Sequence, residues 1–261
     1  MHFNTILVEI ENGVATLTLN RPAAYNAISQ EMTAELSVAL AALRDDPNVR
    51  TIILKGAGKA FSAGGDVKEM LSSTECSSQY LELIKKFNEM AELLLTMPKP
   101  VIAAVQGIAV GAGCSFALAA DICIAGKSAR FGMAFSGVGL SPDAGATFTL
   151  PRAVGLAKAK ELVFRHNIID AATALEIGLV NTVVEDSELN EVAEKLAYEL
   201  AEGPTLAYAL SKKMINNSFS VTLKEALECE AVNQALLASS HDFLEGRTAF
   251  AEKRPPNFNG S

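Results

Sequence analysis

Residues 101–120 read VIAAVQGIAVGAGCSFALAA, and in this stretch only Gln106 and Ser115 are overtly polar. The length approaches the roughly 20 apolar residues that a membrane-spanning helix needs. Three glycines interrupt the stretch, however, two prolines precede it and Asp121 follows it. We therefore interpret it as a buried strand over 101–105, a glycine-rich turn over 106–111 and a buried helix over 112–120. It predicts the core of a folded domain, and no membrane partner is expected.

Strands, loops and helices alternate on both sides of this stretch. Asn12-Gly13 separates two β-rich runs, which is typical of a tight hairpin. A helix is expected from about Ser29 to Asp45 because Met32, Leu36 and Leu40 recur on one face. Such alternation is typical of an α/β fold with buried parallel strands. The expected strands cover 6–10, 14–19, 51–54, 101–105 and 122–125, and a further helix covers about 78–96.

Beyond about residue 189 the apolar periodicity is almost entirely helical. We accordingly divide the chain into an α/β core over 1–200 and a helical C-terminal segment over 201–261. The expected helices of the last part cover 192–200, 206–215, 223–237 and 241–252.

Composition excludes several classes of protein. The chain has 261 residues, 49% of them apolar and 20% charged, which is the balance of a folded globular protein. Its formal net charge of −8 argues against nucleic acid as a partner. No secretion signal opens the chain, and the cysteines lack paired spacing, so we expect a cytoplasmic protein with reduced, mostly buried thiols. The four cysteines are Cys76, Cys114, Cys123 and Cys229.

Two familiar motifs are nearly present. Residues 113–117 read Gly-Cys-Ser-Phe-Ala, which misses the Gly-x-Ser-x-Gly nucleophile motif only at its last position. With Asp143 and then His166 or His241 downstream, a serine hydrolase is a minor alternative to a small hydroxyl packed in a crowded helix. The same stretch lacks the third glycine of a dinucleotide-binding motif. The three histidines have no metal-ligand spacing, so we expect neither a metal nor a redox cofactor.

Two glycine-rich turns remain, over residues 59–68 and 106–114, each between a buried strand and a helix. Small residues let a ligand approach the backbone, and the N–H groups at the start of a helix are unpaired and partly positive. If the two turns converge, they would hold an oxygen atom between two N–H donors. The pair therefore predicts an oxyanion hole, although either turn alone would fit tight packing equally well.

Six short motifs, spread over essentially the whole chain, resemble those of one known family. They are Asn20-Arg21-Pro22 with Asn26-Ala27, Ala60-Phe61-Ser62-Ala63-Gly64-Gly65-Asp66, Lys99-Pro100-Val101-Ile102-Ala103-Ala104-Val105-Gln106-Gly107, Ala119-Ala120-Asp121, Phe131-Gly132 and Glu252-Lys253-Arg254-Pro255-Pro256-Asn257-Phe258. In combination they resemble the crotonase (enoyl-CoA hydratase/isomerase) superfamily. The resemblance implies a spiral of ββα units, and a helical C-terminal segment that builds homotrimers or dimers of trimers. It also implies an acyl-CoA thioester substrate, with coenzyme A as part of the substrate rather than a cofactor.

The resemblance also assigns site residues. The backbone N–H groups of Gly65 and Ala112 would bind the thioester oxygen, although relatives usually have glycine at the second position. The backbone of Ala63 would meet the adenine, and Lys59 and Lys68 match positions near the coenzyme A phosphates and ribose. Surface lysines without a ligand are the alternative reading of that pair. The remaining substrate-binding candidates are Asp66, Ser115 and Phe135.

One carboxylate is left as the catalytic candidate. The hydratases of the family use two glutamates, and the matching positions here hold Ser115 and Phe135, so efficient hydration is not expected. Asp143 lies in Pro142-Asp143-Ala144-Gly145, which resembles the Pro-Asp-x-Gly segment of the family's isomerases. Asp143 could instead merely cap a helix that starts at Ala144. Because both glutamates are absent and two oxyanion turns are present, we favour a single-aspartate enoyl-CoA isomerase.

Other functions stay open beside this one. They are weak or atypical hydration, a ring rearrangement of an epoxide or oxepin, a 4-chlorobenzoyl-CoA dehalogenase-like reaction, and non-catalytic acyl-CoA binding. The dehalogenase reading lacks support because the chain has no tryptophan and no histidine between His2 and His166. We expect the wall of the acyl pocket from residues 72–87 and 133–135, with Phe135 and Phe148 near Asp143.

Overall fold

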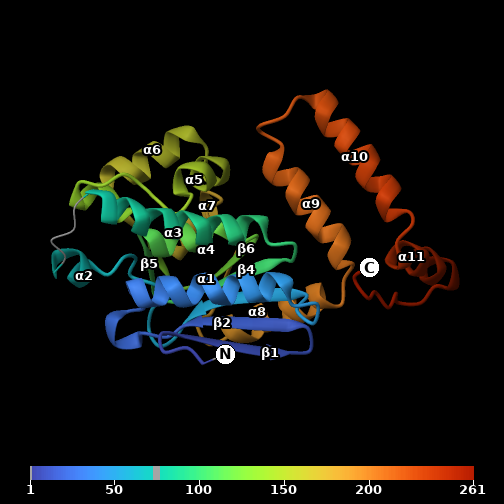
Figure 1. The fold of residues 1–261 in the computed structure, drawn as a ribbon, viewed down its shortest axis with the longest axis horizontal. Helices are drawn as coiled ribbons and strands as arrows, with labels where there is room; N and C mark the ends of the chain where they lie inside the picture. The colour runs from blue at the N-terminus through green and yellow to red at the C-terminus, as the bar shows by residue number, and fades with distance from the viewer. Residues whose placement is uncertain (1, 73–76) are drawn as a thin grey trace.

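A six-stranded sheet forms the centre of the computed structural model, which describes residues 2–72 and 77–261 (Figure 1). The first two strands pair antiparallel as the predicted hairpin, and every later neighbour is parallel. In sheet order the strands are β1 (Ile6–Glu11), β2 (Val14–Leu19), β3 (Thr51–Gly56), β4 (Val101–Val105), β6 (Ile122–Gly126) and β9 (Thr182–Val184). The sequence-based expectation of an α/β fold with buried parallel strands is confirmed.

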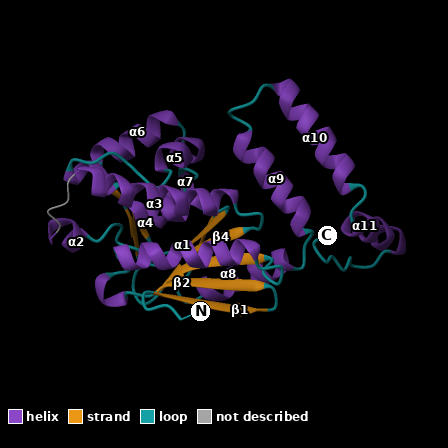
Figure 2. Cartoon of the chain, viewed as in Figure 1, coloured by secondary structure: helices purple, strands orange, loops and turns teal. Residues whose placement is uncertain are grey.

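Helices cover both faces of this sheet (Figure 2). Ile53, Ile102 and Ala104 point to one face and pack against α8 (Leu189–Ala201). The alternate residues, such as Leu54 and Ala103, point to the other face. That face is covered by α1 (Gln30–Asp45), α3 (Ser77–Thr96) and α4 (Ala112–Ala119). Because both faces are buried, the central strands are continuously apolar.

A second, smaller sheet was not predicted from the sequence. It consists of β5 (Ile108–Val110), β7 (Arg130–Gly132) and β8 (Ile168–Asp170) in that order. β5 falls inside the expected turn over 106–111, so the turn is two short corners with a strand between them. The expected helix over 112–120 is α4, which ends at Ala119.

The remaining elements lie in the connections between strands. In chain order they are η1 (Pro22–Ala24), α2 (Val67–Ser72), η2 (Ala134–Val138), α5 (Ala146–Val154), α6 (Leu156–Arg165) and α7 (Ala171–Glu176). Most of these follow β6, in a part of the chain for which the periodicity predicted no elements.

The chain ends in three helices that project from the α/β part (Figure 1). They are α9 (Thr205–Asn217), α10 (Leu223–Leu237) and α11 (His241–Glu252), and residues 205–261 are called the C-terminal arm below. Lys212 ties α9 to the α/β part, because its Nζ donates to the Leu94 carbonyl at 2.9 Å and pairs with Asp121 at 2.8 Å. Asn216 adds a bond to the Leu95 carbonyl at 2.8 Å. No residue of α10 is buried.

Two of the expected buried thiols are buried. Burial raises the pKa of Cys114 to about 12 and also raises that of Cys123, so both stay protonated and unreactive at neutral pH. Cys229 is exposed, because α10 lies outside the core. Cys76 lies outside the described residues. Within the part of the chain that the structure describes, no helix is both long enough and apolar enough to cross a membrane.

Candidate active site

The first glycine-rich turn is anchored by the segment that contains Asn26. The Asn26 amide is fully buried, and its Nδ2 donates to the carbonyls of Ala57 at 2.9 Å and Ala60 at 2.7 Å. Its backbone carbonyl accepts a bond from the Ser62 hydroxyl at 2.8 Å, and that hydroxyl also accepts the Gly64 N–H at 3.2 Å. The side chains of Asn26 and Ser62 together therefore fix the first half of the turn.

This anchoring leaves the Gly65 N–H without an internal partner. The residues on either side of Gly65 both pair with Ile28: the Gly64 carbonyl accepts the Ile28 N–H at 2.8 Å, and the Asp66 N–H donates to the Ile28 carbonyl at 3.1 Å. Along an extended backbone, successive N–H groups point in opposite directions. The Gly65 N–H therefore points away from Ile28, and it meets no acceptor among the described residues.

The second turn packs directly on the first. Ser62 donates its N–H to the Ile108 carbonyl at 3.0 Å and accepts the Val110 N–H at 3.1 Å. A Cβ on Gly113 would lie only 2.6 Å from the Ser62 carbonyl oxygen. Glycine at 113 is thus required by close approach of the two backbones, and the turns do converge in space.

Ala112 begins α4, and its N–H is also available. Gly111 caps this helix with a φ of 53° and no side-chain bond, and the Ala112 N–H has no acceptor in the described part of the chain. A Cβ on Gly64 would lie 3.5 Å from the Ala112 nitrogen, so the two turns bring their unpaired donors into one region. Unpaired N–H groups at a helix start carry a partial positive charge. The pair can hold an anionic oxygen.

Asp143 lies in the loop between η2 and α5, and its carboxylate caps no helix. The helix begins at Ala146, with Gly145 as its N-cap and no side-chain capping bond. The alternative that Asp143 caps a helix from Ala144 is therefore wrong. The Oδ1 atom of Asp143 is buried and has no hydrogen-bond partner in the described structure. Burial raises the pKa of this carboxyl to about 6.

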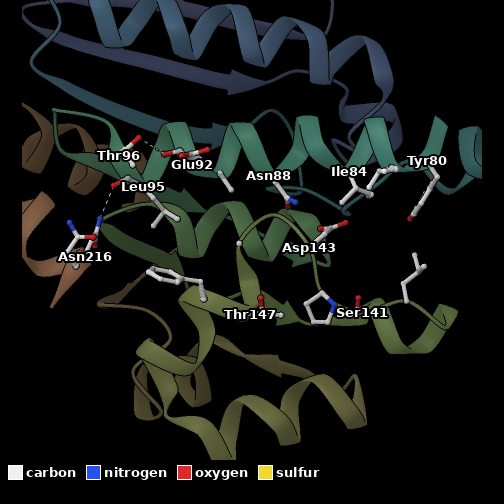
Figure 3. Close-up of a pocket in the computed structure, with 17 residues that line it drawn as sticks. Tyr80, Ile84, Asn88, Glu92, Leu95, Thr96, Ser141, Asp143, Thr147 and Asn216 are labelled. Carbon is white, nitrogen blue, oxygen red and sulfur yellow. Dashed lines mark hydrogen bonds between the residues drawn. The ribbon is translucent and has the colours of Figure 1, made fainter. Parts of the chain in front are cut away.

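Asp143 faces a cavity of about 750 Å³ between α3, its own loop, α5 and the end of α9 (Figure 3). Apolar side chains form much of the wall, and Phe148 is among them, as expected. The apolar lining includes Leu81, Ile84, Ala91, Leu95, Leu140 and Phe148, and the polar lining includes Tyr80, Asn88, Glu92, Asp143 and Asn216. This surrounding desolvates the carboxylate and makes it a stronger base.

The α3 side of the cavity was only partly predicted. Residues 73–76 of the expected wall over 72–87 lie outside the described residues, and residues 133–135 do not line the cavity. Tyr80 and Ile84 fall within the expected range, whereas Asn88 was missed, although residues 80, 84 and 88 share one helix face. Burial, followed by the charge of Asp143, raises the pKa of Tyr80, so its phenol stays protonated. Figure 3 shows Tyr80 and Asn88 pointing toward the Asp143 loop.

Two residues expected to bind substrate are occupied by internal contacts instead. Ser115 is fully buried, and its hydroxyl donates to the Gly111 carbonyl at 3.2 Å, which also removes it as a nucleophile. Asp66 pairs with Arg21 at 2.8 Å and accepts the Lys68 N–H at 3.1 Å. Burial would raise the pKa of Asp66, but the bond and charge of Arg21 lower it overall. Asp66 therefore holds the first turn and the start of α2.

The other predicted residues lie around the turns. The Phe135 ring approaches Gly111, since a Cβ there would lie 4.0 Å from its Cζ, and its carbonyl accepts the N–H of cavity-lining Leu140 at 3.0 Å. Ala63 donates its N–H to the Tyr25 carbonyl at 2.9 Å, which leaves the Ala63 carbonyl available to a ligand. Lys59 and Lys68 are exposed beside the first turn and pair with no carboxylate among the described residues.

Comparison with known proteins gives a consistent result. A sequence profile of the family described as Enoyl-CoA hydratase/isomerase matches residues 9–261. The chain is 42% identical to the 1,2-epoxyphenylacetyl-CoA isomerase of Escherichia coli over 98% of both chains. It is 36% identical to the trans-2-decenoyl-[acyl-carrier-protein] isomerase of Streptococcus mutans over the full length of both. The crystal structure of an enoyl-CoA hydratase from Bacillus anthracis superposes with a TM-score of 0.94 at 36% identity, covering 99% of this chain and all of that one.

Proposed function

The chain belongs to the enoyl-CoA hydratase/isomerase family of the crotonase superfamily, and from this premise we propose that it moves a double bond within an enoyl-CoA thioester. Asp143 is the group that transfers the proton. One observation carries the proposal: the Oδ1 oxygen of Asp143 is buried without a hydrogen-bond partner among the described residues, and Asp143 lines a cavity with many apolar side chains in its wall. The coarser assignment, an enzyme of acyl-CoA thioesters, follows from the family itself.

The two turns supply the electrostatic part of the reaction. The thioester oxygen accepts the N–H groups of Gly65 and Ala112, and negative charge collects on this oxygen when a proton leaves the acyl chain. Each preorganised donor of this kind contributes roughly 3–4 kcal/mol toward the transition state. Both donors are backbone atoms, so the methyl group of Ala112 does not remove the second one.

Asp143 supplies the proton transfer. Its carboxylate takes a proton from C4 of a 2-enoyl-CoA, the electrons delocalise as a dienolate onto the thioester oxygen, and the carboxylic acid returns the proton at C2. The reverse sequence converts a 3-enoyl-CoA into the conjugated isomer. A pKa of about 6 suits both halves, since the group is mostly ionised at pH 7 and its acid form is strong enough to return the proton.

The site is less suited to hydration. Water addition needs groups that hold and activate water, and the two family glutamate positions hold the buried Ser115 and Phe135. The cavity has one other carboxylate, Glu92, which lies one helical turn beyond Asn88 toward the C-terminal arm. Glu92 is exposed, whereas the Oδ1 oxygen of Asp143 is buried.

Product analysis in heavy water tests the proposal. The protein and its Asp143→Asn variant are incubated with trans-3- and trans-2-enoyl-CoA, and products are followed by mass and proton spectra. We expect double-bond migration with deuterium at C2 or C4, and a loss on the order of 10²–10⁴-fold in the variant. Glu92→Gln serves as the comparison, because a gain of one water that depends on Glu92 would establish hydration instead. Binding of CoA esters without any turnover would make the chain a binder.

A ring rearrangement is the second candidate, and the 42% identity to 1,2-epoxyphenylacetyl-CoA isomerase favours it. The same oxyanion donors and the same aspartate would act on an acyl group that carries a strained ring. A parallel incubation with 1,2-epoxyphenylacetyl-CoA separates the two candidates. Isomerisation of the epoxide, with linear enoyl-CoA esters left unchanged, would replace double-bond migration as the activity.

We also propose that the C-terminal arm mediates assembly into homotrimers or dimers of trimers. The arm projects from the α/β part, and α10 buries none of its own side chains. Its exposed apolar residues include Phe219, Leu223, Val232 and Phe250. Apolar surface of this extent is typical of an interface between subunits.

A further inference from the structure

The loop that carries Asp143 has a backbone conformation that is unfavourable for one of its residues, Ala144. Ala144 has a φ of +48° and is fully buried, and Gly145 follows with a φ of +75°. A residue with a Cβ rarely adopts the left-handed region unless its surroundings impose it. The loop must therefore be held from outside at Ala144.

Asn88 of α3 provides that hold. Its Oδ1 accepts the Ala144 N–H at 3.0 Å. Among the described hydrogen bonds of residues 141–145, this is the one that comes from another element. The rest lie within the loop or run into α5, for example from the Ala146 N–H to the Asp143 carbonyl at 3.0 Å.

No other element of the described chain anchors the buried Oδ1 oxygen of Asp143. Asp143 Oδ1 is buried without a partner, and no side chain caps α5. Where the carboxylate lies thus depends on the backbone of residues 142–145, and hence on the bond at Ala144. The neighbours of Asn88 are fixed in turn, since Phe87 and Met90 are buried and the Phe87 ring packs on Phe116 of α4 at 6.3 Å.

We propose that Asn88 is a positioning residue, which holds Ala144 in the left-handed conformation and thereby places the Asp143 carboxylate in the wall of the cavity, with its Oδ1 oxygen buried. The effect on turnover rests on the proposed role of Asp143 in proton transfer, whereas the effect on the carboxylate does not. Asn88 acts through the backbone, so it is expected to change the rate of the chemical step and leave the affinity for substrate nearly unchanged.

The test compares Asn88→Leu with the double variant Asn88→Leu/Ala144→Gly. Leucine keeps the branching of the asparagine side chain and removes the acceptor, while glycine adopts a positive φ without steric cost. The matched control is Glu89→Leu, an exposed neighbour on α3 outside the cavity lining. If Asn88→Leu does not fold, Asn88→Ala provides the same comparison without added bulk.

Two readouts are needed. For turnover, we expect Asn88→Leu to lower kcat by about 10²-fold with KM changed less than about threefold. The double variant should recover about tenfold, and Glu89→Leu should match the parent protein. For the carboxylate, infrared difference spectra against Asp143→Asn counterparts follow the titration of Asp143 without any substrate. We expect its pKa, about 6 in the parent protein, to fall in Asn88→Leu as water reaches the group.

Each contrary outcome overturns the proposal in a distinct way. A raised KM with unchanged kcat would mean that Asn88 contacts substrate. A loss of kcat that Ala144→Gly does not relieve, or an unchanged titration of Asp143 in Asn88→Leu, would exclude positioning through the loop backbone. If the parent protein moves no double bond, the infrared titration still decides the role of Asn88, and only the proposed function fails.

Discussion

At the scale of single residues, Asp143 lowers the stability of the fold in which it sits. Its pKa is about 6 in the folded chain, against an ordinary 3.8. The folded state therefore binds more protons than the unfolded state between about pH 4 and 6, so the free energy of unfolding falls as pH rises through that window. At neutral pH the buried charge costs about 3 kcal/mol.

The first prediction follows from this cost. Asp143→Asn should be more stable than the parent protein at pH 7.5, with a thermal midpoint higher by about 5 °C, because the neutral amide carries no ionised charge into the cavity. The advantage should disappear as pH approaches 4. Thermal unfolding across this pH range measures it, with the exposed Glu194→Gln as control. Equal midpoints for variant and parent at pH 7.5 would contradict the raised pKa.

The same pKa predicts a pH dependence of catalysis. The reaction starts from the ionised carboxylate, so kcat/KM for double-bond migration should rise with pH and level off above about pH 6. The initial rate at low substrate, measured from pH 4.5 to 8, gives this profile. A profile that is flat across pH 6 would show that another group transfers the proton.

At the scale of elements, the contact between the two glycine turns makes Gly113 irreplaceable. Ala is the better helix former by about 1 kcal/mol, so propensity alone predicts that Gly113→Ala stabilises α4. The new Cβ would lie 2.6 Å from the Ser62 oxygen and 2.7 Å from the Ser62 Cβ, and neither atom sits at the end of a flexible side chain. Overpacking of this kind costs about 1–3 kcal/mol and separates the turns.

We therefore expect Gly113→Ala to lower both the free energy of unfolding and kcat/KM. Urea unfolding and initial rates measure the two effects. Gly137→Ala is a suitable control, since its Cβ would meet nothing closer than a His166 ring atom at 3.4 Å. If Gly113→Ala proved as active as the parent, the oxyanion donors would not depend on this contact.

Sequence patterns predicted the elements whose burial is one-sided or continuous. The hairpin, α1 and the central strands follow from periods of 2 and 3.6 and from Asn12-Gly13. Short β5 was missed because its three residues pair only once distant segments have met. The two turns were identified from glycine spacing, whereas Asn88 was not, because its partner is a backbone N–H 56 residues away. Asp66 and Ser115 were expected to bind substrate but make internal contacts, because a sequence motif does not distinguish a residue that contacts a ligand from one that makes an internal contact.

At the scale of the whole molecule, the C-terminal arm carries several large apolar side chains that are exposed. Val232 and Leu236 lie one helical turn apart on α10, and both are more than half exposed, at 68% and 52%. Burial of an aliphatic side chain of this size contributes about 1.5–3 kcal/mol.

The parent protein should accordingly sediment as a trimer or a hexamer. Val232→Glu should weaken association by about tenfold or more, because it places a charge in the buried interface. Sedimentation velocity over a concentration series measures this effect. Gln234 is exposed on the same helix, so Gln234→Glu is the control that shows whether an added negative charge alone weakens association. A parent protein that stays monomeric at all concentrations would contradict the proposed role of the arm.

The donors of the two turns are main-chain atoms, so substitutions during evolution affect them differently from the side chains of the cavity wall. No substitution can delete a backbone N–H except one to proline, so the proposed oxyanion donors persist through most changes of side chain. The cavity wall is made of side chains on α3, α5 and α9, which any substitution there alters. Lineages that share the donors can therefore diverge in the molecules they transform. Relatives about 40% identical, named for reactions as different as epoxide and double-bond isomerisation, are what such an inheritance produces.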